Sequence, residues 1–127
     1  MTPPPYDGVH LIADLTGCTG LDDVALIERA LRAAASAAGA TLIELRLHAF
    51  GPGQGVTGMA LLAESHISIH SWPEHGYAAV DIFVCGRRCD PHAALTTLAD
   101  MLHGSAQHIR SIKRGFGLDQ SAPTNWR

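Results

Sequence analysis

The sequence predicts an α+β fold: a two-layer α/β sandwich with a mainly antiparallel sheet and two helices on one face, in the order β-α-β-β-β-α-β. Two segments repeat apolar residues at helical spacing, and each has a single apolar stripe to bury. Short apolar or alternating runs, bounded by glycine and proline, fill the rest of the chain. Both helices can bury their stripes on the same sheet, which makes two layers the economical arrangement.

The first strand covers residues 9–15, and a glycine-containing turn follows it. Asp22 or Asp23 can cap a helix that runs to about Ala38, where Gly39 supplies a left-handed stop. The apolar stripe of this helix consists of Val24, Ile27, Leu31, Ala34 and Ala38.

Residues 41–50 alternate apolar and polar side chains, as a half-exposed strand does, and lead into a glycine-rich loop at 51–55. Three more strands are expected at 57–64, 66–72 and 77–85. Asp90 and Pro91 then start a helix, with the aspartate as cap and the proline at the first helical position. Its buried stripe is Leu95, Leu98, Ala99 and Leu102. Gly104 ends this helix, and a last strand covers about 107–114.

The composition describes one compact domain, residues 1–127, of 13.4 kDa with 46% hydrophobic and 17% charged residues. A net charge of −3 without a large basic cluster argues against a nucleic-acid partner. No apolar run approaches the roughly 20 residues of a membrane span. Three cysteines without disulfide spacing favour the cytoplasm. The sheet face without helices predicts a homodimer, because a second copy would cover it.

The most informative segment surrounds Ser65, which lies between Glu64 and His66. In an extended chain His66 and His70 share one face and Ser65 points to the other, so a kink is needed before Ser65 and His70 can share a pocket.

Three chemistries compete for this segment. His66 and His70, with His75, could bind a metal, but the first two lie about 13 Å apart along a strand. We therefore predict no metal site. A serine hydrolase is disfavoured because no Gly-x-Ser-x-Gly elbow is present and the serine leads into a strand. In the third, Ser65 attacks its own backbone.

Residues 62–86, Leu-Ala-Glu-Ser-His-Ile-Ser-Ile-His-Ser-Trp-Pro-Glu-His-Gly-Tyr-Ala-Ala-Val-Asp-Ile-Phe-Val-Cys-Gly, resemble the central block of the small prokaryotic S-adenosylmethionine decarboxylases. These are pyruvoyl enzymes made as self-cleaving proenzymes. The resemblance extends more loosely from His10 through Gly17-Cys18 to Asp90-Pro91 and covers the chain apart from its two tails.

The resemblance implies that Ser65 Oγ attacks the Glu64 carbonyl carbon and converts the peptide bond into an ester. Elimination and hydrolysis then leave two chains, 1–64 and 65–127, the second of which begins with a pyruvoyl group. By analogy with the family, His70 assists the processing proton transfers together with a hydroxyl at position 57. This chain has Thr57 where the family usually has serine.

The pyruvoyl group derived from Ser65 is the implied cofactor. A substrate amine forms a Schiff base with its ketone, and the carbonyl accepts the electron pair released as CO₂ departs. The resemblance assigns reprotonation of the carbanion to Cys85, because a thiol is a competent neutral acid near pH 7. Without the resemblance, Cys85 would be interpreted as a small buried hydrophobe. Cys89 is expected to have no chemical role.

The small-molecule substrate implied is S-adenosylmethionine, decarboxylated to the aminopropyl donor of spermidine and polyamine biosynthesis. Phe50 and Trp72 are candidate faces for adenine, and Glu74 is the candidate ribose acceptor. Alternatively, the two aromatic residues are core or dimer-interface side chains and Glu74 is a solvated turn charge.

Two departures from the family pattern affect the expected adenine pocket. The loop 51–55 is longer and richer in glycine, and Leu47 stands where an aromatic is common. They favour, as an alternative, a pyruvoyl-dependent arginine or ornithine decarboxylase. A second alternative, an unprocessed non-enzymatic homologue, is supported by Thr57.

Overall fold

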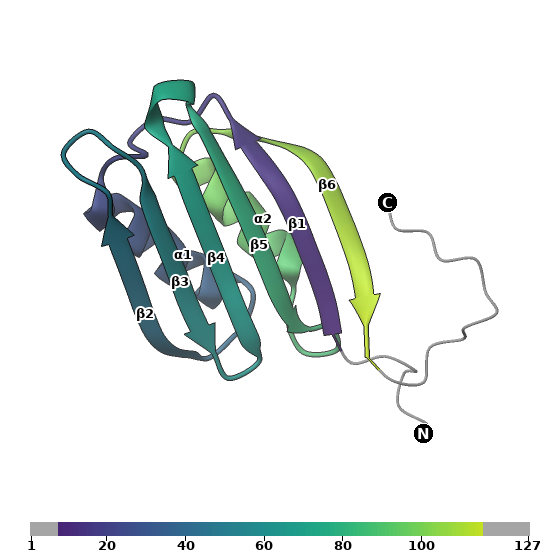
Figure 1. The fold of residues 1–127 in the computed structure, drawn as a ribbon. Coiled ribbons are helices and arrows are strands. Elements are labelled where there is room, and N and C mark those ends of the chain that lie inside the picture. The colour runs from purple at the N-terminus through teal and green to yellow at the C-terminus, as the bar shows by residue number, and fades with distance from the viewer. Residues whose placement is uncertain (1–7, 116–127) are drawn as a thin grey trace, which may run out of the picture.

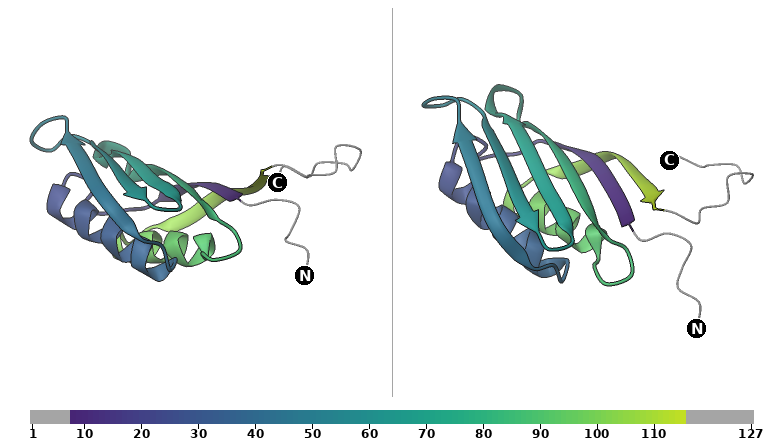
Figure 2. Two further views of the ribbon diagram at one scale, coloured as in Figure 1. Left: turned by 90° about the horizontal axis from the view of Figure 1, so that it is seen from below. Right: turned by 60° about the horizontal axis from the view of Figure 1, so that its bottom comes forward.

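A computed structural model describes residues 8–115; the proline-rich start at 1–7 and the tail at 116–127 lie outside the described residues. A six-stranded sheet carries two helices on one face (Figures 1 and 2). In chain order the elements are β1 (Gly8–Thr16), α1 (Val24–Ala37), β2 (Leu42–Ala49), β3 (Val56–Leu62), β4 (Ser65–Trp72), the 3₁₀ turn η1 (Pro73–His75), β5 (Tyr77–Cys85), α2 (Pro91–Met101) and β6 (Ser105–Arg114).

The sheet has the strand order β2-β3-β4-β5-β1-β6, and every neighbouring pair is antiparallel. The predicted two-layer architecture is therefore confirmed. The six strands expected from the sequence are all present. Four of them lie between the two helices, whereas the predicted order β-α-β-β-β-α-β has three there. Strand β4 lies in the middle of the sheet, between β3 and β5.

The turn between β3 and β4 lies earlier than the sequence predicted, since β3 ends two residues before the expected position 64 and β4 begins one residue before 66. Leu62 pairs with Ser65, so the turn consists of Ala63 and Glu64, and Ser65 is the first residue of β4. Both turn residues are held by Thr41, just before β2. The Ala63 N–H donates to the Thr41 carbonyl, and the Thr41 N–H donates to the Glu64 carboxylate, each at 2.9 Å. These two bonds stop the chain from extending straight through Glu64.

Both helices begin and pack as their patterns indicated. Asp23 caps α1 by accepting from the Leu26 N–H, and Asp90 caps α2 by accepting from the Ala93 N–H, each at 3.1 Å. Such a cap contributes about 1 kcal/mol. The predicted stripe residues Ile27, Leu31, Ala34 and Ala38 of the first helix, and Leu95, Leu98, Ala99 and Leu102 of the second, are buried against the sheet.

Ser71 on β4 is the buried polar side chain of the described core. Its hydroxyl donates to the Leu21 carbonyl at 2.8 Å and accepts from the Val56 N–H at 2.9 Å. The backbone of Gly55 lies so close that a Cβ there would be 2.1 Å from the Ser71 carbonyl oxygen. These contacts fix the end of the 51–55 loop beside β4.

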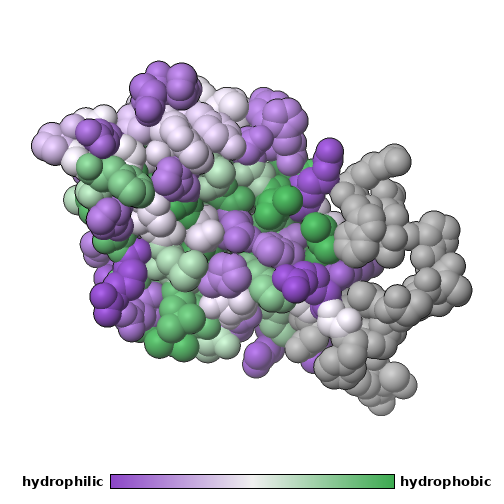
Figure 3. Space-filling model, in the orientation of Figure 1, coloured by the Kyte–Doolittle hydropathy of each residue, from purple (hydrophilic) through white to green (hydrophobic). Residues whose placement is uncertain are grey.

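The other face of the sheet carries no helix (Figure 2). Apolar side chains are exposed on it, among them Ile12 at 39%, Met59 at 46% and Leu61 at 47%. Figure 3, which looks onto this open face, shows apolar and polar side chains interspersed. Within residues 8–115, the helices are too short or too polar to cross a membrane.

Candidate functional site

Strand β4 carries the candidate site. Ile67 and Ile69 point into the core, while His66, Ser68 and His70 alternate with them on the open face, as the sequence predicted. Because β4 is central, its open-face side chains have neighbours from β3 on one side and β5 on the other.

Ser65 has a strained backbone. Its φ is 141°, a region that non-glycine residues rarely enter and that costs about 1–3 kcal/mol. Successive strand residues normally point to opposite faces. Here the Ser65 Oγ lies 3.0 Å from Nδ1 of its neighbour His66. The kink needed at Ser65 is therefore present, but it directs the hydroxyl toward His66 and away from His70.

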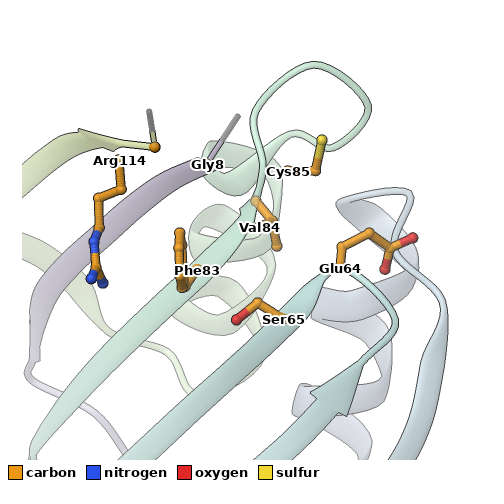
Figure 4. A pocket seen from close by; sticks show the side chains of 8 residues that line it. Gly8, Glu64, Ser65, Phe83, Val84, Cys85 and Arg114 are labelled. Carbon is orange, nitrogen blue, oxygen red and sulfur yellow. The ribbon is translucent and has the colours of Figure 1, made fainter. Parts of the chain in front are cut away.

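A cavity of about 360 Å³ opens beside Ser65 (Figure 4). Glu64 and Ser65 line it from the start of β4, and Phe83, Val84 and Cys85 line it from the end of β5. Gly8, Arg114 and Gly115 complete the lining. Figure 4 shows the Ser65 hydroxyl on the side of Phe83, while the Glu64 carboxyl group points the other way. Glu64, Ser65 and Cys85 therefore line one cavity, with the Cys85 sulfur directed away from Ser65 (Figure 4).

His70 and Thr57 form a separate pair. They are register partners on β4 and β3, and Thr57 Oγ1 lies 2.7 Å from His70 Nδ1. Ser65 and His70 are separated by five strand residues, which is about 16 Å. Within one chain, the structure therefore does not bring His70 and Thr57 to the Glu64–Ser65 bond.

The predicted substrate-binding residues gather around His70. A cavity of about 540 Å³ is lined by Phe50, Gly53, Gln54, Gly55, His70, Ser71, Trp72 and Glu74. The His70 ring lies 4.2 Å from Trp72 and 5.6 Å from Phe50, centroid to centroid. Phe50 is 51% exposed, which excludes a core role within this chain.

The two departures from the family pattern, the 51–55 loop and Leu47, lie in different parts of the structure. The glycine-rich loop does line the cavity through Gly53, Gln54 and Gly55. Leu47, however, packs against the helix-covered core. The expectation that Leu47 alters the substrate pocket is wrong, because alternation along β2 turns its side chain to the other face.

Trp72 is supported by a hydrogen-bonded group at the same end of the sheet. Its ring stacks on Tyr77 at 5.1 Å, and the Tyr77 hydroxyl donates to Asp14 at 2.7 Å. His108 Nδ1 lies 2.8 Å from the other Asp14 oxygen. The bonds from Tyr77 and then His108 lower the pKa of Asp14, because they stabilise the carboxylate. The pKa of Tyr77 is raised, chiefly by its bond to Asp14.

Sequence reasoning missed a polar cluster beside Ser65. His10 Nε2 contacts Asp81 Oδ1, and His66 Nε2 lies 3.5 Å from Asp81 Oδ2. These three side chains come from β1, β4 and β5. The sequence did contain a signal for this cluster, because Asp81 is the single charged residue in the strand Tyr77–Cys85.

The same three residues are the candidate metal group within the described chain, since their potential ligand atoms lie within 4.8 Å of one another. The set considered from the sequence differs. His70 contacts Thr57 instead, and His75 lies in η1 beyond the end of β4.

The cysteines occupy different environments. Cys85 is half-buried at the cavity, whereas Cys18 and Cys89 are buried. Burial is the main cause that raises the pKa of both buried thiols.

Comparison with known proteins gives a consistent result. The family model described as S-adenosylmethionine decarboxylase matches residues 9–115. An S-adenosylmethionine decarboxylase proenzyme of Methanococcus aeolicus is 52% identical over 110 residues, covering 85% of this chain and 93% of that protein. The proenzyme of Thermomicrobium roseum is 42% identical over 112 residues, covering 88% and 97%. The crystal structure of the adenosylmethionine decarboxylase from Aquifex aeolicus is similar with a TM-score of 0.72 and 35% identity, covering 94% of this chain and 98% of that one.

Proposed function

The chain belongs to the S-adenosylmethionine decarboxylase family, and we propose that it is a proenzyme that cleaves itself at Glu64–Ser65 to form a pyruvoyl group. The resemblance inferred from residues 62–86 is confirmed, and the enzyme is a carboxy-lyase. It acts on S-adenosylmethionine in polyamine biosynthesis. The cytoplasm is its proposed location.

The observation that carries the proposal is the geometry of the Glu64–Ser65 junction. A two-residue turn, fixed by two bonds to Thr41, meets a serine with φ at 141°. Converting the peptide bond into an ester and then breaking it would release this strain. Attack of Ser65 Oγ on the Glu64 carbonyl carbon needs a proton acceptor next to the hydroxyl, and a histidine nitrogen lies at 3.0 Å.

The residues around Ser65 fit a pyruvoyl group at position 65. The cavity there is open on one side, has a thiol at Cys85 and has a cation at Arg114. When formed, the pyruvoyl group would supply an electron sink for the departing CO₂. Cys85 would hold and deliver the proton that replaces the carboxylate.

Intact mass tests the processing. The purified chain is expected to convert from one species of 13.4 kDa into two species of about half that mass. Ser65→Ala removes the attacking oxygen and should remain full length and inactive. Persistence of wild-type chain as a single 13.4 kDa species after long incubation would instead support the non-enzymatic homologue.

The positions of the residues favour a homodimer. Ser65 and Cys85 lie at one end of the open face, and His70 lies at the other end with the proposed substrate residues. A two-fold axis parallel to the sheet and perpendicular to its strands would place the two ends against each other. Each complete site would then take Ser65 from one copy and His70 from the other, and the exposed apolar side chains of the open face would be buried.

Mixing two inactive variants tests this arrangement. The His70→Ala chain alone should stay uncleaved if His70 assists processing. Co-expressed with a differently tagged Ser65→Ala chain, it should be cleaved, because the second chain supplies an intact His70. Cleavage of His70→Ala without its partner, or no cleavage in purified mixed dimers, would contradict the composite site.

The cavity around His70 supports S-adenosylmethionine as the substrate. Phe50 and Trp72 present aromatic rings to one space, where they can face adenine and lie near a sulfonium cation. Glu74 lines the same space and can accept hydrogen bonds from ribose hydroxyls. Free arginine or ornithine has neither an aromatic base nor ribose hydroxyls, although its cationic end can still face an aromatic ring. The glycine-rich loop is the feature that keeps that alternative open.

A direct assay separates the two decarboxylase functions. Release of CO₂ should be measured from S-adenosylmethionine, arginine and ornithine under the same conditions. We expect the wild type to act on S-adenosylmethionine. Trp72→Ala should raise KM for this substrate more than it lowers kcat, because an adenine-binding surface is lost. Activity confined to the free amino acids would reject the proposed substrate and leave self-processing intact.

Cys85→Ala tests the proton donor. This variant should cleave normally, since no processing step is assigned to the thiol, and its kcat should fall about 10²- to 10⁴-fold. Cys89→Ala is the matched control: Cys89 is buried and does not line the cavity, so kcat should hardly change. Full turnover by processed Cys85→Ala would show that another group delivers the proton.

A further inference from the structure

The polar cluster beside Ser65 forms a continuous chain of contacts across four strands. Ser65 Oγ lies 3.0 Å from His66 Nδ1, and His66 Nε2 lies 3.5 Å from Asp81 Oδ2. The other Asp81 oxygen contacts His10 Nε2. His10 Nδ1 lies 3.3 Å from an Arg114 guanidinium nitrogen. The chain therefore runs from the proposed attacking oxygen to a permanent cation.

The two ends of this chain determine where the protons lie. A guanidinium can only donate, so His10 Nδ1 accepts from Arg114 and His10 Nε2 donates to Asp81. His66 Nε2 lies 3.5 Å from the negatively charged Asp81 carboxylate, which favours the tautomer that carries the proton on Nε2. His66 Nδ1 is then left as an acceptor, which faces the Ser65 hydroxyl.

Packing keeps the cluster in this arrangement. The Phe83 ring stacks on His10 at 5.1 Å and meets His66 edge-on at 6.0 Å. The Arg114 guanidinium lies 4.9 Å from the centre of the same ring. Ser68 donates to Asp81 at 3.3 Å and adds a further hydrogen bond to the carboxylate. His10 and His66 are 22% and 29% exposed, so solvent reaches them only in part.

We propose that His66 is the proton acceptor for Ser65 Oγ in the first step of self-processing, and that Asp81 and His10 position it. The assignment rests on the proposed function. His70 of the same chain lies about 16 Å away, and the proposed dimer would bring only the partner's His70 to Ser65, whereas His66 already contacts the Ser65 hydroxyl within its own chain. His70 remains available for later proton transfers.

The step is an isomerisation that needs no co-reactant. The Ser65 O–H bond breaks and its proton moves to His66 Nδ1, while Oγ bonds to the Glu64 carbonyl carbon. The Glu64–Ser65 C–N bond then breaks as the same proton passes to the Ser65 nitrogen. The products are an ester between Glu64 and the Ser65 oxygen and a free amine. Asp81 stabilises the transient imidazolium.

His66→Ala provides the main test, with cleavage and not decarboxylation as the readout. We expect the rate of spontaneous cleavage at residues 64–65 to fall at least about 10²-fold. The uncleaved chain should also resist neutral hydroxylamine, which cleaves esters but not peptide bonds. Added imidazole should restore part of the cleavage. An uncleaved chain that hydroxylamine does cut would show that the acyl shift proceeds without His66 and would overturn the assignment.

Asp81→Asn covers the case in which His66→Ala does not fold. Asparagine keeps the size of the side chain but removes the charge that fixes the His66 tautomer, so cleavage should slow, and Asp81→Glu should recover part of the rate. Wild-type cleavage rates in Asp81→Asn would reject the positioning role.

His92→Ala is the matched control, because His92 is an exposed histidine of α2, on the helix-covered side of the sheet, and has no part in either proposed site. It should cleave like the wild type. An equal loss in His92→Ala would show that the effect is not specific to His66 and would overturn the proposal. Dialysis against EDTA should change nothing; a loss of cleavage restored by Zn²⁺ would make His10, His66 and Asp81 a metal site instead.

Cleavage of the wild type distinguishes a failure of this proposal from a failure of the proposed function. Cleavage of the wild type together with normal cleavage of His66→Ala rejects the His66 assignment alone. A wild-type chain that never cleaves rejects the proposed function, and the His66 assignment with it.

Discussion

The site depends on the tight turn that joins β3 to β4. Hydrogen bonds to Thr41 fix Ala63 and Glu64, and the ladder between β3 and β4 begins immediately at Leu62 and Ser65. Because the chain is fixed on both sides of Ser65, this residue takes up the unusual backbone conformation, with a φ of 141°. About 1–3 kcal/mol of strain is small against the stability of a domain, yet it is localised at one bond. The same conformation turns the hydroxyl toward His66, so the strain at Ser65 and its contact with His66 have a single structural cause.

The sheet also fixes the distance between the two groups of functional residues. Five residues of β4 hold Ser65 and His70 about 16 Å apart, and a hydrogen-bonded central strand cannot bend to bring them together. The two cavities are therefore distinct features of one chain. One has the Glu64–Ser65 bond, where cleavage is proposed, and a thiol; the other has aromatic rings and a carboxylate. The proposed face-to-face dimer would join them without unfolding the sheet.

The fold could be predicted from the sequence because its signals are local. Asp23, Asp90 and the two apolar stripes specify the helices, and alternation specifies which face each strand side chain occupies. The β3–β4 turn was predicted too late in the chain because the residue that fixes it, Thr41, lies 23 positions from Glu64. The polar cluster was missed for the same reason: His10 and Asp81 are 71 positions apart in sequence. Motifs predicted the chemistry at Ser65, but only the structure showed which histidine lies beside it.

Thr57 illustrates how geometry changes the weight of a substitution. From the sequence, threonine in place of serine was the one feature that favoured a chain unable to process itself. In the structure, Thr57 lies in β3 with an exposed side chain, and its hydroxyl reaches His70 at 2.7 Å. A strand accommodates a β-branched residue well, and restriction of χ1 favours a hydroxyl that is already directed at its partner. The added methyl group therefore leaves the hydrogen bond in place, and the argument for a non-enzymatic homologue loses its support.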